Sequence, residues 1–313
     1  MNLKGLIPAP FTPFHPDGTI HPEVIPAYAN RLQKKGVIGV FINGTTGEGL
    51  LLTMDERKKM AEAWIDHQCA DFRVIIHVGA TSIEDSLELT RHAASIGAHA
   101  VSTMAPLFLK PQNVKALVDY CAIIADEVAD MPFYFYHIPQ ITGQDFMMVE
   151  FLEYAEGKIP NLAGIKYSGT NIMDVLLCAE YENQRMDIIY GQDEKLLAGL
   201  VFGLEGAIGS TYNYMPGHYI ELIQAYRDGD LEKARKYQLA SAQLVRYMDQ
   251  YGGGIRVGKR IMKEIGIDCG DLRSPGQSIT ELEWKDFQNT LVQNDLHLFE
   301  EVSQFAAPKN LTK

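Results

Sequence analysis

Short runs of consecutive apolar residues recur along the first two-thirds of the chain, and each is followed by a stretch with helical spacing. Strands of a parallel sheet are covered on both faces, so they are typically apolar at successive positions rather than at alternate ones. The pattern predicts eight strands, at residues 6–8, 39–42, 74–77, 100–104, 133–136, 162–166, 188–190 and 207–210.

The stretches between these runs carry signals of helix ends. Thr53 and Glu56 have the spacing of a capping box, in which each side chain accepts a hydrogen bond from the other residue's backbone N–H. Thr81 and Glu84 repeat this spacing. Three glycines are expected to end helices in the left-handed conformation: Gly36, Gly97 and Gly203.

Eight alternations of strand and helix predict a (β/α)8 TIM barrel of the α/β class. A doubly wound open sheet is the alternative, but six parallel strands would leave two runs unexplained, and no Gly-rich nucleotide motif opens a helix. Beyond Tyr214 the strand signal ends, and helical patterns follow at 219–227, 231–247, 256–265 and 279–305. We assign residues 1–235 to the barrel and residues 236–313 to a C-terminal helical extension packed on it.

Charge narrows the class of partner. The chain of 313 residues has 28 Lys and Arg against 40 Asp and Glu, a net charge of -12, which disfavours nucleic acid and anionic membranes. No stretch approaches the ~20 apolar residues of a membrane span, and prolines interrupt the N-terminus before a signal-peptide core forms. The four cysteines form no CxxC motif and are expected to be buried thiols in a reducing compartment. We therefore expect a cytoplasmic protein.

Two residues at predicted strand ends are candidates for catalysis, because barrel enzymes place catalytic groups there. Lys166 ends the sixth run, where burial would lower its pKa and yield the neutral amine that attacks a carbonyl carbon. The alternative is a lysine that extends from the barrel rim into water. Tyr136 ends the fifth run and can relay a proton through its phenol, although aromatic residues also pack in strands.

Polar groups after the second and seventh runs are candidates for binding. Thr45 and Thr46 lie between glycines, and the hydroxyl and N–H groups of such a turn suit a carboxylate or phosphate oxygen. An ordinary Gly-rich turn is the alternative. Asp193 and Glu194 follow Gly191 and suit hydroxyl binding, a metal, or simply an acidic helix start. Because the nine histidines show no metal-ligand spacing, we predict no metal.

Four motifs occur in barrel order: Gly44-Thr-Thr-Gly-Glu48, Tyr136-x-x-Pro139, Gly164-Ile-Lys166 and Gly206-Ala-Ile-Gly-Ser210. In these motifs the chain resembles the class I aldolase superfamily that includes dihydrodipicolinate synthase and N-acetylneuraminate (sialic acid) lyase. The match is closest to the lyases, through residues 41–49, 76–79, 136–139 and 209–213. The synthases have an arginine for a second substrate carboxylate two residues after the Pro139 position, where this chain has Ile141.

The resemblance implies a mechanism and a set of roles. Lys166 would form a Schiff base with the C2 ketone of open-chain N-acetylneuraminate, which is then cleaved to N-acetylmannosamine and pyruvate. Tyr136 would relay the proton of the C4 hydroxyl, and Thr45 and Thr46 would bind the pyruvate-end carboxylate. The remainder of the sugar would contact Ser168, Gly191, Asp193, Glu194 and Ser210. The resemblance also implies a homotetramer and no cofactor besides the covalent Schiff base on Lys166.

Two departures and three alternative functions accompany this resemblance. Phe108 stands where related enzymes often have a tyrosine of an intersubunit proton relay, and residues 252–254 offer no aromatic contact for an acyl chain. One alternative is an aldolase that cleaves another 2-keto-3-deoxy sugar acid, and another is dihydrodipicolinate synthase itself. The third, from a different class, is a sensor that keeps the pocket without the chemistry.

Overall fold

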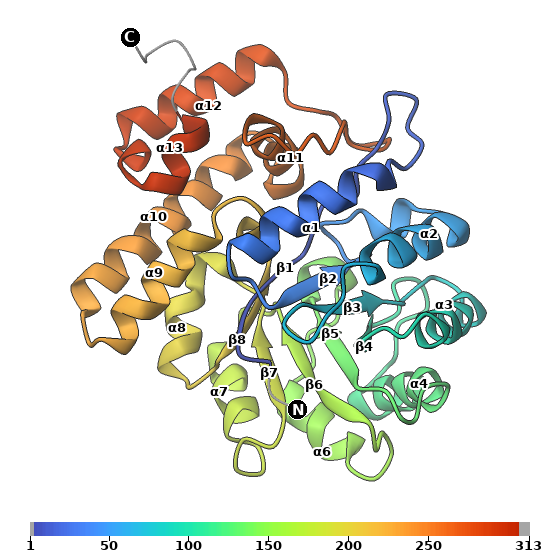
Figure 1. Ribbon diagram of the computed structural model, residues 1–313. Helices are drawn as coiled ribbons and strands as arrows, with labels where there is room; N and C mark the ends of the chain where they lie inside the picture. Colours follow the sequence, from blue (N-terminus) through green and yellow to red (C-terminus); the bar gives the residue numbers. More distant parts are fainter. Residues whose placement is uncertain (1–2, 307–313) are drawn as a thin grey trace.

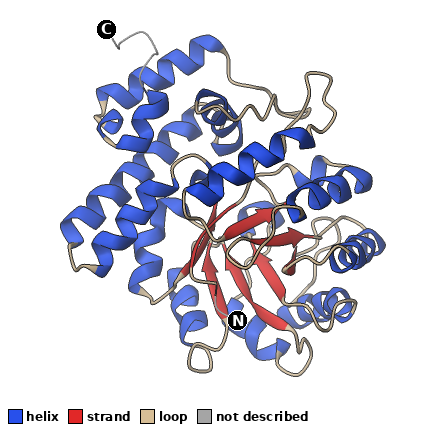
Figure 2. Cartoon of the chain, viewed as in Figure 1, coloured by secondary structure: helices blue, strands red, loops and turns tan. Residues whose placement is uncertain are grey.

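The computed structural model describes residues 3–306 and contains eight parallel strands arranged as a barrel, with helices outside it (Figures 1 and 2). The strands are β1 (Gly5–Pro8), β2 (Gly39–Ile42), β3 (Arg73–His77), β4 (Ala100–Met104), β5 (Phe133–His137), β6 (Leu162–Tyr167), β7 (Asp187–Tyr190) and β8 (Gly206–Gly209). Hydrogen-bonded neighbours follow the order β1-β8-β7-β6-β5-β4-β3-β2. The Ile38 N–H donates to the Leu6 carbonyl at 3.0 Å beside β1 and β2, at the remaining seam. The predicted barrel is confirmed.

All eight predicted strands are present, with bounds within one residue of those expected. The parallel register places particular strand-end residues side by side: Tyr136 on β5 pairs with Lys166 on β6, which in turn pairs with Ile189 on β7. The barrel therefore brings residues that are far apart in sequence to one mouth.

The helices outside the strands are α1 (Ile25–Lys34), α2 (Met54–Ile65), α3 (Ile83–Ser95), α4 (Val114–Asp126), α5 (Pro139–Thr142), α6 (Met148–Ala155), α7 (Ile172–Glu180), α8 (Leu196–Val201) and α9 (Pro216–Arg227). Four more follow: α10 (Leu231–Gln250), α11 (Gly254–Glu264), α12 (Glu281–Gln293) and α13 (Glu300–Ala306). Short 3₁₀ turns are η1 (Pro22–Val24), η2 (Gly49–Leu51), η3 (Asp193–Lys195), η4 (Thr211–Asn213) and η5 (Leu296–Leu298).

Helices α10 to α13 gather on one side of the barrel, where α10 packs along α9 (Figure 1). The expected division at residue 235 falls inside α10, so the division into barrel and extension stays a prediction. The single helical pattern expected at 279–305 is wrong: α12 ends at Gln293, and Asp295 adopts a left-handed φ of 60° before η5 and α13. A left-handed residue cannot continue an α-helix, so the chain turns there.

The predicted capping box of α2 is confirmed, because Thr53 Oγ1 accepts from the Glu56 N–H and the Glu56 carboxylate accepts from the Thr53 N–H. The cap expected at Thr81 is wrong. Helix α3 has Ser82 at its N-cap, and the Ser82 side chain accepts no capping hydrogen bond. Ser86 instead donates its hydroxyl to the Ser82 carbonyl, at 3.3 Å. The three glycine stops are confirmed, with φ of 78°, 74° and 81° at Gly36, Gly97 and Gly203.

Two apolar clusters build the core. One fills the barrel interior with residues such as Ile7, Phe41, Ile75 and Tyr134, and the larger one lies between the strands and the helices. All four cysteines are free; three are buried as expected, but Cys69 is exposed, which corrects that expectation. Within residues 3–306, no helix is both long and apolar enough to cross a membrane.

Candidate active site

The amine of Lys166 lies inside the barrel mouth, near the end of β6. The residue is only 4% exposed. Its Nζ lies 3.9 Å from the centroid of the Tyr136 ring and 4.1 Å from that of the Phe41 ring. Burial lowers the pKa of Lys166 to about 7, while the negative charge of Asp193 acts in the opposite direction. A substantial fraction of this amine is therefore neutral near pH 7.

Tyr136 lies beside Lys166 on the neighbouring strand. Burial raises the pKa of its phenol to about 12, and hydrogen bonds with Thr45 and Ser168 act in the opposite direction. The phenol therefore keeps its proton at neutral pH. It can pass that proton on only while receiving another, and the hydroxyls of Thr45 and Ser168 are within its reach.

A tight turn after β2 presents Thr45 and Thr46 to the same mouth. Asn43 and Glu48, at its two ends, adopt left-handed φ values of 57° and 53°. Inside it, the Glu48 N–H donates to the Thr45 carbonyl at 3.0 Å. The chain packs closely here, because a Cβ on Gly47 would lie 3.1 Å from the Pro10 carbonyl oxygen.

Asp193 is held in one orientation by the loop that follows β8. It is 5% exposed, and its Oδ2 accepts hydrogen bonds from Thr211 N at 2.8 Å and Thr211 Oγ1 at 2.7 Å. Gly209 makes room for it, since a Cβ there would lie 1.6 Å from Asp193 Oδ1. Burial raises the pKa of Asp193, and burial followed by the charge of Asp193 raises that of Glu194.

These groups face one cavity of about 310 Å³ at the carboxyl ends of the strands. It is lined by every residue that the sequence nominated, namely Thr45, Thr46, Tyr136, Lys166, Ser168, Gly191, Asp193, Glu194 and Ser210. Their individual roles stay predictions. The arrangement combines a neutral amine, a proton-carrying phenol and many hydroxyl-binding groups, so it suits covalent chemistry on a polyhydroxylated carbonyl compound.

Sequence reasoning missed several lining residues. Gln140 and Gln192 both donate their amide N–H groups to the Ser168 carbonyl, at 3.1 and 2.8 Å, and so fix the loop after β6. Val245 and Met248 of α10 add an apolar wall from the C-terminal helices. Gln192 could have been found because it lies between the nominated residues Gly191 and Asp193. Val245 and Met248 could not, because two apolar residues three positions apart on a helix look like ordinary core residues.

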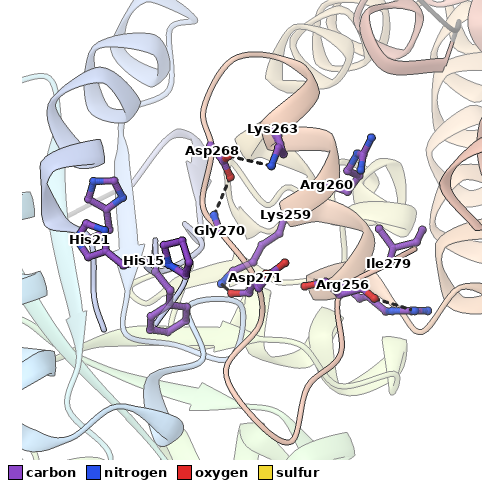
Figure 3. A pocket seen from close by; sticks show the side chains of 13 residues that line it. His15, His21, Arg256, Lys259, Arg260, Lys263, Asp268, Gly270, Asp271 and Ile279 are labelled. Atoms are coloured by element: carbon purple, nitrogen blue, oxygen red, sulfur yellow. Dashed lines mark hydrogen bonds and ion pairs between the residues drawn. The ribbon is translucent and has the colours of Figure 1, made fainter. Parts of the chain in front are cut away.

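A second cavity, of about 300 Å³, lies between residues 14–21 and α11 (Figure 3). It is rich in cations, but each already has a carboxylate partner: Arg256 with Glu283, Lys259 with Glu48, Arg260 with Glu281 and Lys263 with Asp268. These paired charges leave little unsatisfied attraction for an anion, which distinguishes this cavity from the one around Lys166.

A group of possible metal ligands lies at this second cavity. The rings of His15 and His21 stack with centroids 3.8 Å apart, and their Nε2 atoms lie 4.0 and 3.9 Å from Glu23 Oε2. The three side chains are 41%, 33% and 72% exposed and do not line the Lys166 cavity. The absence of a metal from the chemistry at Lys166 stays a prediction.

The fold and the Lys166 cavity together define a class: barrel proteins in which a lysine at a strand end is placed to attack a carbonyl carbon. The chain belongs to the dihydrodipicolinate synthetase family, whose model matches residues 2–294.

Relatives within the family are similar over nearly their whole length. The chain is 41% identical over 287 residues to N-acetylneuraminate lyase A of Xenopus laevis, covering 91% of this chain and 94% of the relative. It is 41% identical over 278 residues to N-acetylneuraminate lyase of Danio rerio, covering 87% and 90%. The solved structure of Proteus mirabilis N-acetylneuraminate lyase superposes with a TM-score of 0.90 at 38% identity, covering 95% of this chain and all of that one.

Proposed function

We propose that the protein is a Schiff-base aldolase that cleaves N-acetylneuraminate to N-acetylmannosamine and pyruvate. One observation carries the proposal: the amine of Lys166 is nearly buried, its pKa is lowered to about 7, and it faces a cavity lined by hydroxyl-binding groups. The similarity to several N-acetylneuraminate lyases supports the choice of substrate.

In the proposed reaction, the neutral amine of Lys166 adds to the C2 ketone of the open-chain sugar, and uptake of one proton from solvent with loss of one water gives a protonated imine. The imine accepts the electron pair of the C3–C4 bond as that bond breaks. In the same step the C4 hydroxyl passes its proton to the phenol oxygen of Tyr136, and the phenol passes its own proton on to the hydroxyls of Thr45 and Ser168, from which a proton returns to C3 of the enamine. N-acetylmannosamine leaves. The enamine then takes up this proton at C3, and water hydrolyses the resulting imine to release pyruvate and free Lys166.

Binding roles follow from the chemistry of the donors. Thr45 and Thr46 would donate hydrogen bonds to the carboxylate next to the ketone. Asp193 and Glu194, with Ser168, Gly191 and Ser210, would hold the hydroxyls and the N-acetyl chain, since a carboxylate accepts two or more hydroxyl hydrogen bonds. No cofactor or metal takes part in these steps; the covalent intermediate on Lys166 supplies the electron sink.

The test combines turnover with trapping. The wild-type protein should release pyruvate from N-acetylneuraminate, and pyruvate with borohydride should leave a stable adduct on the Lys166 peptide. Lys259 is a matched internal control because it is as buried as Lys166, with 3% of its surface exposed. Its amine pairs with Glu48 at 2.7 Å, so it should carry no adduct. Lys166→Ala should abolish both signals. An active protein without an adduct on Lys166 would overturn the mechanism, and turnover of another 2-keto-3-deoxy sugar acid in preference would overturn the substrate.

We also propose a homotetramer in the cytoplasm. The four free thiols are compatible with a reducing compartment. Phe108 and Leu109, each 81% exposed, are apolar side chains that a subunit contact would cover. Light scattering after size exclusion should give four times the 35.0 kDa chain mass; a monomeric mass would exclude the tetramer.

A further inference from the structure

Arg57 carries a buried charge that, among the residues the structure describes, no carboxylate contacts directly. The residue lies in the first turns of α2 and is 2% exposed. Its guanidinium donates to the carbonyls of His77, at 2.6 Å, and Gly79, at 2.9 Å, while its Nε is buried without a hydrogen bond. Within residues 3–306 it forms no ion pair. Burial lowers its pKa to about 10, and the charge of Asp85 acts in the opposite direction, so Arg57 remains charged at neutral pH.

Arg57 does not line the Lys166 cavity but contacts residues that support its lining. Asn43 begins the turn that carries Thr45 and Thr46, and its side-chain amide donates to the Arg57 carbonyl at 3.0 Å. On the other side, the His77 ring packs edge-on against the Tyr136 ring, with centroids 6.0 Å apart. The backbone of Arg57 therefore contacts the start of the turn, and its guanidinium contacts the end of β3 at His77, whose ring packs on Tyr136.

The charge of Arg57 is offset by Asp85 at a distance but, within residues 3–306, by no ion pair. Arg57 contacts the backbone of His77, whose imidazole cannot become an anion. Burial and the charges of Arg57 and Lys166 lower the pKa of His77 well below the usual 6.5. The imidazole is therefore neutral. Asp193, the buried aspartate of the cavity, acts on Lys166. Glu48, at the end of the turn, pairs with Lys259 at 2.7 Å, so a ligand anion at the turn would be a further partner for the charge of Arg57.

We propose that Arg57 is a positioning residue whose fixed positive charge makes the turn at residues 43–49 select ligands that carry a carboxylate next to the ketone. It acts through the turn and does not contact the ligand. The proposal rests on the proposed function, in which that carboxylate belongs to the pyruvate end of the substrate. Thr45 and Thr46 supply neutral hydrogen bonds, and the buried cation supplies the charge complement that neutral donors lack.

The experiment compares two small ketones, pyruvate and hydroxyacetone, which differ by the carboxylate. Half-saturating concentrations are measured by borohydride trapping on Lys166 in the full-length protein. Arg57→Gln removes the charge but keeps an amide that can donate to a carbonyl. It should raise the half-saturating concentration of pyruvate about tenfold and leave that of hydroxyacetone unchanged. Arg57→Lys keeps the charge and should retain the wild-type preference for pyruvate.

Arg273→Gln is the matched control. The Arg273 guanidinium braces the same region through the Leu51 carbonyl, but its charge is already paired with Glu56 at 2.6 Å, so its loss should not change the preference. Equal weakening of both ketones in Arg57→Gln, or loss of the preference in Arg57→Lys, would overturn the proposal. If Arg57→Gln fails to fold, Arg57→Lys still decides between charge and shape. Absence of any trapping in the wild type would instead refute the proposed function.

Discussion

The pH dependence of imine formation gives the sharpest test of how burial prepares Lys166. With its pKa at about 7 instead of 10.5, about half of the amine is neutral at pH 7, against roughly 1 in 3,000 for an ordinary lysine. Since only the neutral amine attacks a ketone, the trapping rate should be flat above pH 8. Below pH 7 it should fall about tenfold per pH unit.

Asp193→Asn should move this profile in a defined direction. The carboxylate favours the ammonium form of Lys166, so its removal lowers the pKa further and shifts the acid limb to lower pH. An opposite charge nearby is worth about one unit of pKa or more. If the pKa of Lys166 falls by about one unit, the trapping rate at pH 6 should rise from about 0.1 to about 0.5 of the plateau rate. The Asn side chain can still accept the hydrogen bonds from Thr211.

Pyruvate alone is the ligand for this assay, because the expected contacts of Asp193 with the sugar then play no part. Trapping by cyanoborohydride is followed by mass spectrometry at pH values from 5.5 to 9. Glu194→Gln is the control: this neighbouring carboxylate is not among the charges that shift Lys166, so the limb should stay in place. A wild-type limb near pH 10 would refute the burial argument. An unmoved limb in Asp193→Asn would refute the assigned role of its charge.

Three further substitutions test other contacts. Tyr136→Phe should reduce lyase turnover by ~10²–10⁴, the usual contribution of a general acid or base, with trapping of pyruvate largely retained; a near-native rate would remove the phenol from the mechanism. Gly209→Ala should abolish sugar cleavage, since the new Cβ would lie 1.6 Å from Asp193 Oδ1, and measured activity close to wild type would show that Asp193 moves freely. Lys259→Met should lower the free energy of unfolding by about 3–5 kcal/mol, because it leaves the Glu48 carboxylate buried without its partner. In denaturant titrations, adding Glu48→Gln should recover part of that loss, and no recovery would contradict the pairing argument.

The barrel could be predicted because its strands are covered on both faces, so their apolar runs are continuous and stand out from the amphipathic helices. Local signals were less secure. Thr81 has the spacing of a cap, but the chain starts α3 at Ser82, and sequence spacing alone cannot tell which hydroxyl will face the helix end. The break at Asp295 was missed because its neighbours continue a helical pattern.

The polar cavity was predictable to the extent that strand ends converge. Lys166 and Tyr136 could be named from position alone, since each ends an apolar run. Thr211 could not, because its role depends on η3 and η4 meeting in space, where its N–H and hydroxyl fix Asp193. The wall formed by Met248 depends likewise on how α10 packs over the barrel mouth.

Arg57 shows that some of the missing information was present in the sequence in another form. The buried face of α2 consists of Arg57, Met60, Ala61 and Trp64, spaced as one helical stripe. A net charge of -12 counts this arginine like any other and so conceals it. A charged residue in phase with an apolar stripe must be desolvated, and the cost is sustained only where the fold supplies partners or the site uses the charge. Here the partners are two uncharged carbonyls. A charged residue that falls on the buried, apolar face of a helix therefore says more than the total charge about how an acidic protein can select an anionic ligand.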